Sequence, residues 1–143
     1  MNVARFDPVK DVADGARKAR ILVVDDDDSM RALVREALLR TGYEVVEAKD
    51  GAALLRSIDA AQRGYGSYDM IIADVRMPGD SGLAGLANLR EHDAHTPFIL
   101  MTGFTDADVR EDAIRLGASE MFEKPFPVRR LVEAVRELIP PTL

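Results

Sequence analysis

Short apolar runs alternate with amphipathic stretches along most of this chain. Each run is four or five residues long and is followed by turn-forming or charged residues, which is typical of strands buried on both faces of a parallel sheet. The runs cover residues 20–24, 44–48, 70–74, 97–101 and 119–123. Together they predict five strands separated by helical segments.

The intervening stretches carry apolar residues every three or four positions, which predicts helices with one buried face. Asp28 or Ser29 is expected to cap the first helix, Ser81 the third and Thr105 the fourth. The predicted inward residues are Met30, Leu33, Val34, Ala37 and Leu38; Leu54, Leu55 and Ile58; Leu83, Leu86 and Ala87; Val109, Ala113 and Leu116; and Val128, Leu131, Val132, Val135, Leu138 and Ile139.

Regular alternation of strand and helix predicts an α/β domain with a flavodoxin-like, doubly wound (βα)5 fold. The strand order 2-1-3-4-5 is expected for this count, and it places the first and third strands side by side at the switch point. We expect the domain to cover residues 20–139. A loosely ordered N-terminal extension over residues 1–19 and a C-terminal tail over residues 140–143 complete the predicted organisation.

Composition narrows the class of protein. The 143 residues fit one domain, and 47% hydrophobic with 31% charged residues is ordinary for a globular protein. The absence of cysteine excludes disulfides and thiolate metal sites and, with no signal sequence or long apolar run, indicates a cytoplasmic protein without membrane association. A formal net charge of −6 argues against direct nucleic-acid binding.

Carboxylates stand where two of the buried strands end. Asp74 closes the third strand, and Asp25 and Asp26 directly follow the first. One alternative is that Asp74 only caps a turn and that the acidic run only favours a helix N-terminus, which we accept for Asp27 and Asp28. If the other three carboxylates meet at one edge, their repulsion requires a cation, and a purely oxygen ligand set suits Mg²⁺.

Two further strand ends bring groups that complement an anion. Thr102 supplies a hydroxyl after the fourth strand, and Lys124 supplies an ammonium after the fifth. A divalent cation, an ammonium and a hydroxyl commonly hold a phosphoryl group, so Asp74 is expected to act as a nucleophile that forms an acyl phosphate.

Five segments resemble the response-regulator receiver domains of bacterial two-component signalling, over about residues 19–139. They are Val23-Val24-Asp25-Asp26-Asp27, Asp74-Val75-Arg76-Met77-Pro78-Gly79, Met101-Thr102-Gly103, Gly117-Ala118 and Lys124-Pro125-Phe126. The loop after Asp74 and the Met-Thr-Gly segment look most like receivers of the NtrC-type group.

The resemblance implies that Asp74 accepts phosphate from a histidine kinase or a phosphotransfer protein, and that the domain assists its own phosphorylation and dephosphorylation. It implies that Asp25, Asp26 and Asp74 hold Mg²⁺ together with the backbone carbonyl of Arg76. Thr102 and Lys124 resemble the pair that contacts the phosphoryl oxygens and signals their presence.

One position departs from the family pattern. Members usually carry Tyr or Phe three residues before the lysine, whereas this chain has Met121. Phe122 is expected to point to the opposite face of the strand. If Thr102 and Lys124 pull on the phosphoryl group, the surface of the helix after Thr105, the strand over 119–123 and the last helix should respond. Its mixed charges suit a partner or a second copy, and its expected exposed residues are Asp108, Arg110, Glu111, Arg115, Arg129 and Arg130.

Three other functions share part of this pattern. A haloacid-dehalogenase-type phosphatase needs a second Asp two residues after the nucleophile, where this chain has Arg76. A dinucleotide-binding domain needs a glycine-rich turn after the first strand, where four aspartates stand. A receiver-like interaction module that is not phosphorylated remains the third alternative, and a phosphoryl mimic such as beryllium fluoride with Mg²⁺ distinguishes it.

Overall fold

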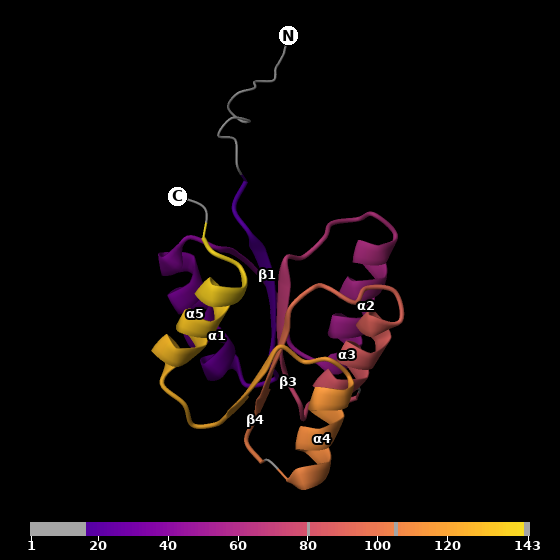
Figure 1. Cartoon of the computed structure of the whole chain (residues 1–143). Helices are drawn as coiled ribbons and strands as arrows, with labels where there is room; N and C mark the ends of the chain where they lie inside the picture. The colour runs from indigo at the N-terminus through magenta and orange to yellow at the C-terminus, as the bar shows by residue number, and fades with distance from the viewer. Residues whose placement is uncertain (1–16, 80, 105, 142–143) are drawn as a thin grey trace.

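A central parallel sheet lies between two layers of helices (Figure 1). This computed structural model describes residues 17–79, 81–104 and 106–141. The strands are β1 (Arg20–Val24), β2 (Glu44–Ala48), β3 (Met70–Asp74), β4 (Phe98–Thr102) and β5 (Glu120–Glu123), and the helices are α1 (Asp28–Thr41), α2 (Gly51–Gln62), α3 (Gly82–Arg90), α4 (Ala107–Arg115) and α5 (Val128–Leu138). The sheet order β2-β1-β3-β4-β5 confirms the predicted fold and topology.

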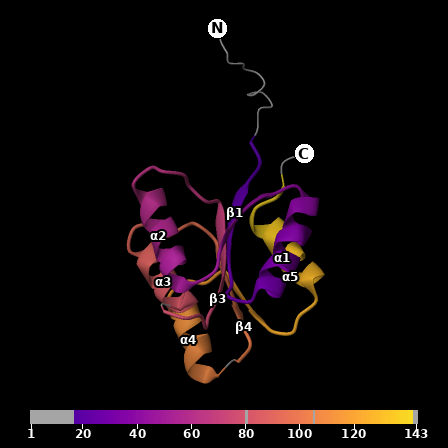
Figure 2. The same ribbon diagram turned by 180° about the vertical axis from the view of Figure 1, so that it is seen from behind.

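The two helical layers explain why the central strands are apolar runs. Helices α1 and α5 cover one face of the sheet, and α2, α3 and α4 cover the other (Figures 1 and 2). Along β1, Leu22 and Val24 belong to the core on the α2–α4 side, while Ile21 and Val23 belong to the core on the α1/α5 side. Alternate side chains of a strand point to opposite faces, so a strand covered on both sides is apolar throughout.

The cap of α1 differs from the prediction. Asp27, not Asp28 or Ser29, is the N-cap, and its Oδ1 accepts hydrogen bonds from the backbone N–H groups of Ser29 at 3.0 Å and Met30 at 3.2 Å. The run of acceptors hides this position in the sequence, since each of these residues can cap a helix. One carboxylate oxygen of Asp27 is thereby engaged by the start of α1.

The predicted N-cap is confirmed for α3 and is wrong for α4. Ser81 caps α3 as predicted, with its Oγ accepting from the N–H of Ala84 at 3.1 Å. Asp106 caps α4 by accepting from the N–H of Val109 at 2.8 Å, so the prediction for Thr105, which lies outside the described residues, is wrong. Asp is as good an N-cap as Thr, and the helix begins one residue later than expected.

Two residues of the predicted inward stripes face solvent. Leu33 on α1 is 51% exposed and Leu138 at the end of α5 is 38% exposed, whereas Val34 and Leu38 are fully buried. The sheet-facing stripe is narrower than the apolar pattern, and Leu33 lies on its flank. Apolar residues at such flanks are common on protein surfaces.

The boundaries of the domain are only partly described. Regular structure begins at Arg20 and the last helix ends at Leu138. Most of the predicted extension over 1–19, and residues 142–143 of the predicted tail, lie outside the described residues, so both remain predictions. Within the described part of the chain, no helix combines the length and apolar character needed to cross a bilayer.

Candidate functional site

Asp25 lies fully buried at the carboxyl end of β1. Its Oδ1 accepts the N–H of Asp27 at 3.0 Å, and its backbone carbonyl accepts a hydrogen bond from Nη1 of Arg31 at 2.7 Å. The largely covered guanidinium of Arg31 also contacts Asp28 at 2.8 Å and Glu47 at 3.0 Å. These contacts fix the backbone of Asp25 and one of its carboxylate oxygens, and its Oδ2 accepts a hydrogen bond from Lys124.

Asp74 and Lys124 complete the centre of the site. Lys124, directly after β5, donates from Nζ to Oδ2 of Asp25 at 3.0 Å and to Oδ2 of Asp74 at 3.1 Å. Asp26, which is exposed, adds a third carboxylate, and one ligand oxygen from each of Asp25, Asp26 and Asp74 lies within 4.8 Å of the others. The structure thus brings together four of the predicted residues from three separate strand ends.

The charges at this edge do not balance. Burial raises the pKa of Asp74, the charge of Asp25 adds to the effect, and the hydrogen bond and charge of Lys124 offset it only in part. Burial lowers the pKa of Lys124, but hydrogen bonds and charges from Asp25 and Asp74 outweigh this and raise it overall. The Lys124 ammonium therefore contacts two of the three grouped carboxylates, and a divalent cation would relieve the excess negative charge.

A close backbone approach shapes the loop after Asp74. The N–H of Gly82 donates to the carbonyl of Val75 at 3.1 Å. A Cβ on Gly82 would lie 2.4 Å from the carbonyl oxygen of Asp74 and 3.2 Å from Cδ2 of Leu100. Glycine at this position lets α3 begin directly against the strand end that carries Asp74.

We expect Gly82→Ala to destabilise the domain by about 2 kcal/mol, because the clash is with backbone atoms that have little room to move. Urea denaturation monitored by circular dichroism measures this loss. Gly103→Ala is the matched control, since a Cβ there meets nothing within 4 Å. Equal stability of the two variants would contradict the close approach at Gly82.

The remaining predicted residues lie around this centre. Thr102 is fully buried at the end of β4, and its hydroxyl donates to the carbonyl of Phe104 at 2.7 Å while accepting the N–H of Phe104 at 3.1 Å. The N–H of Arg76 lies 3.4 Å from Oδ1 of Asp74. Met121 is half-buried in the core on the α2–α4 side, and Phe122 packs on the opposite side, as strand alternation predicted.

Arg31 is the contributor to the site that the sequence analysis missed. A cation in the first turn of a helix is disfavoured by the helix dipole, so its presence there was a usable signal. The carbonyl of Asp25 and two nearby carboxylates account for its position. The peptide bond between Lys124 and Pro125 is cis, which the sequence analysis also did not anticipate.

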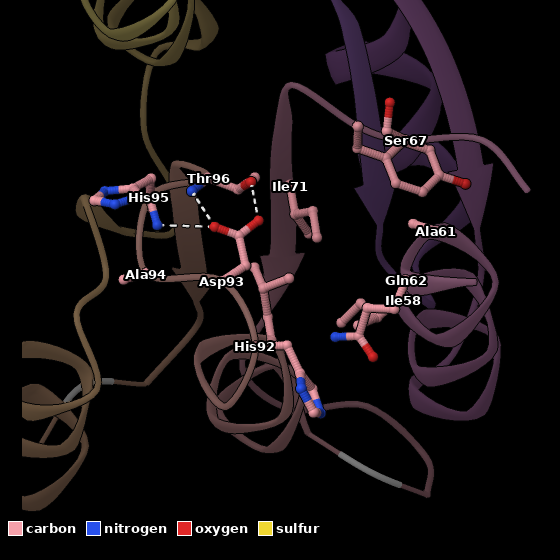
Figure 3. Close-up of a pocket in the computed structure, with 12 residues that line it drawn as sticks. Ile58, Ala61, Gln62, Ser67, Ile71, His92, Asp93, Ala94, His95 and Thr96 are labelled. Atoms are coloured by element: carbon pink, nitrogen blue, oxygen red, sulfur yellow. Dashed lines mark hydrogen bonds between the residues drawn. The ribbon is translucent and has the colours of Figure 1, made fainter. Parts of the chain in front are cut away.

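A separate hollow lies at the opposite, amino edge of the sheet (Figure 3). It has a volume of about 800 Å³ and lies between the ends of α2 and α3 and the loop that leads into β4. Asp93 in this loop accepts from the N–H groups of His95 at 2.8 Å and Thr96 at 2.9 Å and from the Thr96 hydroxyl. Its carboxylate is thus used to hold its own loop, and this hollow does not belong to the acidic site.

Comparison with known proteins agrees with this geometry. The family model for the response regulator receiver domain matches residues 21–136. The chemotaxis protein CheY of Bacillus subtilis is 31% identical over 121 residues, which cover 84% of this chain and 97% of CheY. The chain belongs to the response regulator receiver domain family.

Relatives with additional sequence are also found. The C4-dicarboxylate transport transcriptional regulatory protein DctD of Pseudomonas aeruginosa, from the NtrC-type group, is 35% identical over 123 residues. That match covers 85% of this chain and 25% of DctD, so the chain spans about a quarter of that relative's length.

Among solved structures, the response regulator TrrA of Thermotoga maritima in complex with Mg²⁺ and beryllium fluoride superimposes with a TM-score of 0.73 at 35% identity. The match covers 85% of this chain and 99% of TrrA. The similarity therefore extends over nearly the whole receiver domain.

Proposed function

We propose that Asp74 is the phosphoacceptor of this receiver domain. The observation that carries the proposal is the carboxylate of Asp74 at the end of β3, 3.1 Å from the Lys124 ammonium and grouped with two further carboxylates. In the proposed reaction an oxygen of Asp74 attacks the phosphorus of a phosphohistidine on a histidine kinase or phosphotransfer protein. A P–O bond forms, the P–N bond breaks, and the imidazole leaves with a proton.

The residues present fit a Mg²⁺ ion. Asp25, Asp26 and Asp74 supply oxygen donors, and we propose that the backbone carbonyl of Arg76 completes the protein ligands. The ion would neutralise charge on the phosphoryl oxygens during transfer. Lys124 then gives up one of its carboxylate contacts to bind a phosphoryl oxygen, and the Thr102 hydroxyl binds another.

The proposed readout is a change in the surface formed by α4, β5 and α5. The charged residues expected there are all exposed in the structure, namely Asp108, Arg110, Glu111, Arg115, Arg129 and Arg130. A mixed-charge surface suits a second copy of the chain or a partner protein. We propose signalling in the cytoplasm through this surface, with no direct contact to nucleic acid.

Beryllium fluoride with Mg²⁺ tests the function without a kinase, because it mimics a phosphoryl group on an aspartate. We expect amide exchange of the wild-type chain to change at the loops around Asp25 and Asp74 and over residues 103–123. No change anywhere at saturating Mg²⁺ and beryllium fluoride would instead support an interaction module that takes no phosphate.

The size of this response should depend on Met121. Methionine can fill a gap by changing rotamer, but it cannot place a ring in the space that opens when Thr102 moves. Met121→Tyr is therefore expected to enlarge the exchange changes over residues 103–123. Met70→Leu, in the buried start of β3, is the control for a methionine replacement elsewhere. A response in Met121→Tyr that equals the wild-type response would remove Met121 from the switch.

A further inference from the structure

The resting position of the Thr102 hydroxyl is set by one residue. Phe104 receives a hydrogen bond at its carbonyl and donates one from its N–H, so both polar backbone groups of Phe104 close on the same oxygen. Thr102 is also held at its own carbonyl by the N–H of Lys124 at 2.7 Å. The strand end is therefore fixed, and only the hydroxyl and the segment around Phe104 can change partners.

The side chain of Phe104 is not secured by burial. It is 57% exposed, in the loop that leads into the N-cap of α4 at Asp106. The guanidinium of Arg76 lies over its ring, with 5.4 Å between the carbon of the guanidinium and the ring centroid. This distance is within the range of cation–π attraction.

We propose that Arg76 and Phe104 are positioning residues that form a bridge between the loop after β3 and the loop after β4. The bridge stabilises the arrangement in which the Thr102 hydroxyl is bound to Phe104. The inference rests on the proposed phosphorylation of Asp74, because it assigns the bridge a role in resisting the change that phosphorylation brings about.

The physical argument is a competition for one hydroxyl. Thr102 can donate either to the carbonyl of Phe104 or to a phosphoryl oxygen, since a hydroxyl has one proton to donate. Every contact that holds Phe104 in place favours the state in which Thr102 donates to Phe104. A ligand that needs Thr102 to donate to a phosphoryl oxygen then binds more weakly, by the factor by which these contacts lower the population of that second state. In a chain with Met121 in place of a ring, the aromatic that moves with Thr102 is then Phe104.

A double-mutant cycle tests the bridge. Phe104→Leu keeps an apolar side chain without the aromatic face, and Arg76→Met keeps the stem without the charge while leaving the backbone carbonyl. An exposed cation–π contact corresponds to about a two- to five-fold change in an equilibrium constant. We expect Phe104→Leu to tighten apparent beryllium fluoride binding by about that factor at saturating Mg²⁺, and to have no effect in the Arg76→Met background.

Amide exchange of Phe104 provides a second, ligand-free measurement. Its N–H is protected by the Thr102 hydroxyl, so exchange is expected to accelerate about two- to five-fold in Phe104→Leu and in Arg76→Met. Arg110→Met and Ile114→Val, both at exposed positions of α4, should leave it unchanged.

The outcomes separate the two proposals. Failure of the wild-type chain to bind beryllium fluoride would contradict the proposed function, while the exchange measurement would still decide whether the bridge exists. Normal wild-type binding with no change in Phe104→Leu, or the same change in both backgrounds, overturns the bridge alone. Weaker binding in Arg76→Met, with Phe104 exchange unaltered, would show that Arg76 attracts the anion directly.

Discussion

Asp74→Asn is expected to reduce phosphate incorporation from acetyl phosphate in the presence of Mg²⁺ by at least about 100-fold, because the amide cannot act as the nucleophile. The carboxylate of Asp74 is the buried acid that touches Lys124 from β3, and Asn keeps its shape. Radiolabelled acetyl phosphate followed by acid and base treatment of the product measures the acyl phosphate.

The same substitution should stabilise the fold. The pKa of Asp74 is raised in the folded protein, chiefly by burial, so ionisation of this group costs the folded state free energy at neutral pH. Below the pKa of the unfolded chain the group is protonated in both states, and the cost vanishes. Asp74→Asn removes the cost, and we expect stabilisation on the order of 1 kcal/mol at pH 7 that disappears in acid.

Asp59→Asn is the matched control, since Asp59 is an exposed carboxylate on α2 that, among the described contacts, forms an ion pair only with Arg63, the C-cap residue of that helix. It should alter neither labelling nor stability appreciably. Label that persists at the wild-type level in Asp74→Asn would move the acceptor to another residue. Loss of label together with a less stable fold would mean that the variant is damaged. An amide spectrum that matches the wild type away from Asp74 would instead show that only the nucleophile is lost.

The apolar runs and helical stripes were sufficient to predict the fold. The residues of β1 and β3 that belong to the two cores are all apolar, and this pattern favours a parallel sheet covered by helices on both faces. The strand order then brought Asp25, Asp26 and Asp74 together as expected. The fold and the strand order could be predicted because the apolar pattern repeats along the whole domain, so that no single residue decides them.

What could not be predicted was the choice among neighbouring equivalents. Asp27, Asp28 and Ser29 can each cap α1, and which of them does so depends on the backbone conformation of the short segment between β1 and α1. The hydrogen-bond partner of the Thr102 hydroxyl could not be predicted either, because the sequence does not determine which backbone groups lie within hydrogen-bond distance of a side chain. Both depend on differences of a few ångströms in loop geometry, whereas a hydrophobic period averages over several turns.

Asp26→Ala is expected to weaken Mg²⁺ binding by at least about ten-fold and to slow phosphorylation through the metal. Asp26 is the better of the two β1 carboxylates to test. It is exposed, whereas Asp25 is fully buried and also bonds to Lys124 and to the N–H of Asp27. Replacing Asp25 would leave the partly buried ammonium of Lys124 short of a partner, so a loss of Mg²⁺ binding there could reflect local rearrangement.

Asp28→Asn provides the control within the same acidic run, because its amide oxygen can still accept the hydrogen bond of Arg31, which holds the carbonyl of Asp25. It removes the same charge two residues away, from a carboxylate that is 86% exposed and pairs with Arg31. A general effect of negative charge on Mg²⁺ would weaken binding similarly in both variants, whereas a ligand role for Asp26 weakens it in Asp26→Ala alone. Mg²⁺ titrations followed by calorimetry and by amide chemical shifts measure both. Unchanged affinity in Asp26→Ala would assign the ligand role to Asp25, Asp74 and water. Asp26 would then be an exposed carboxylate that does not bind the ion.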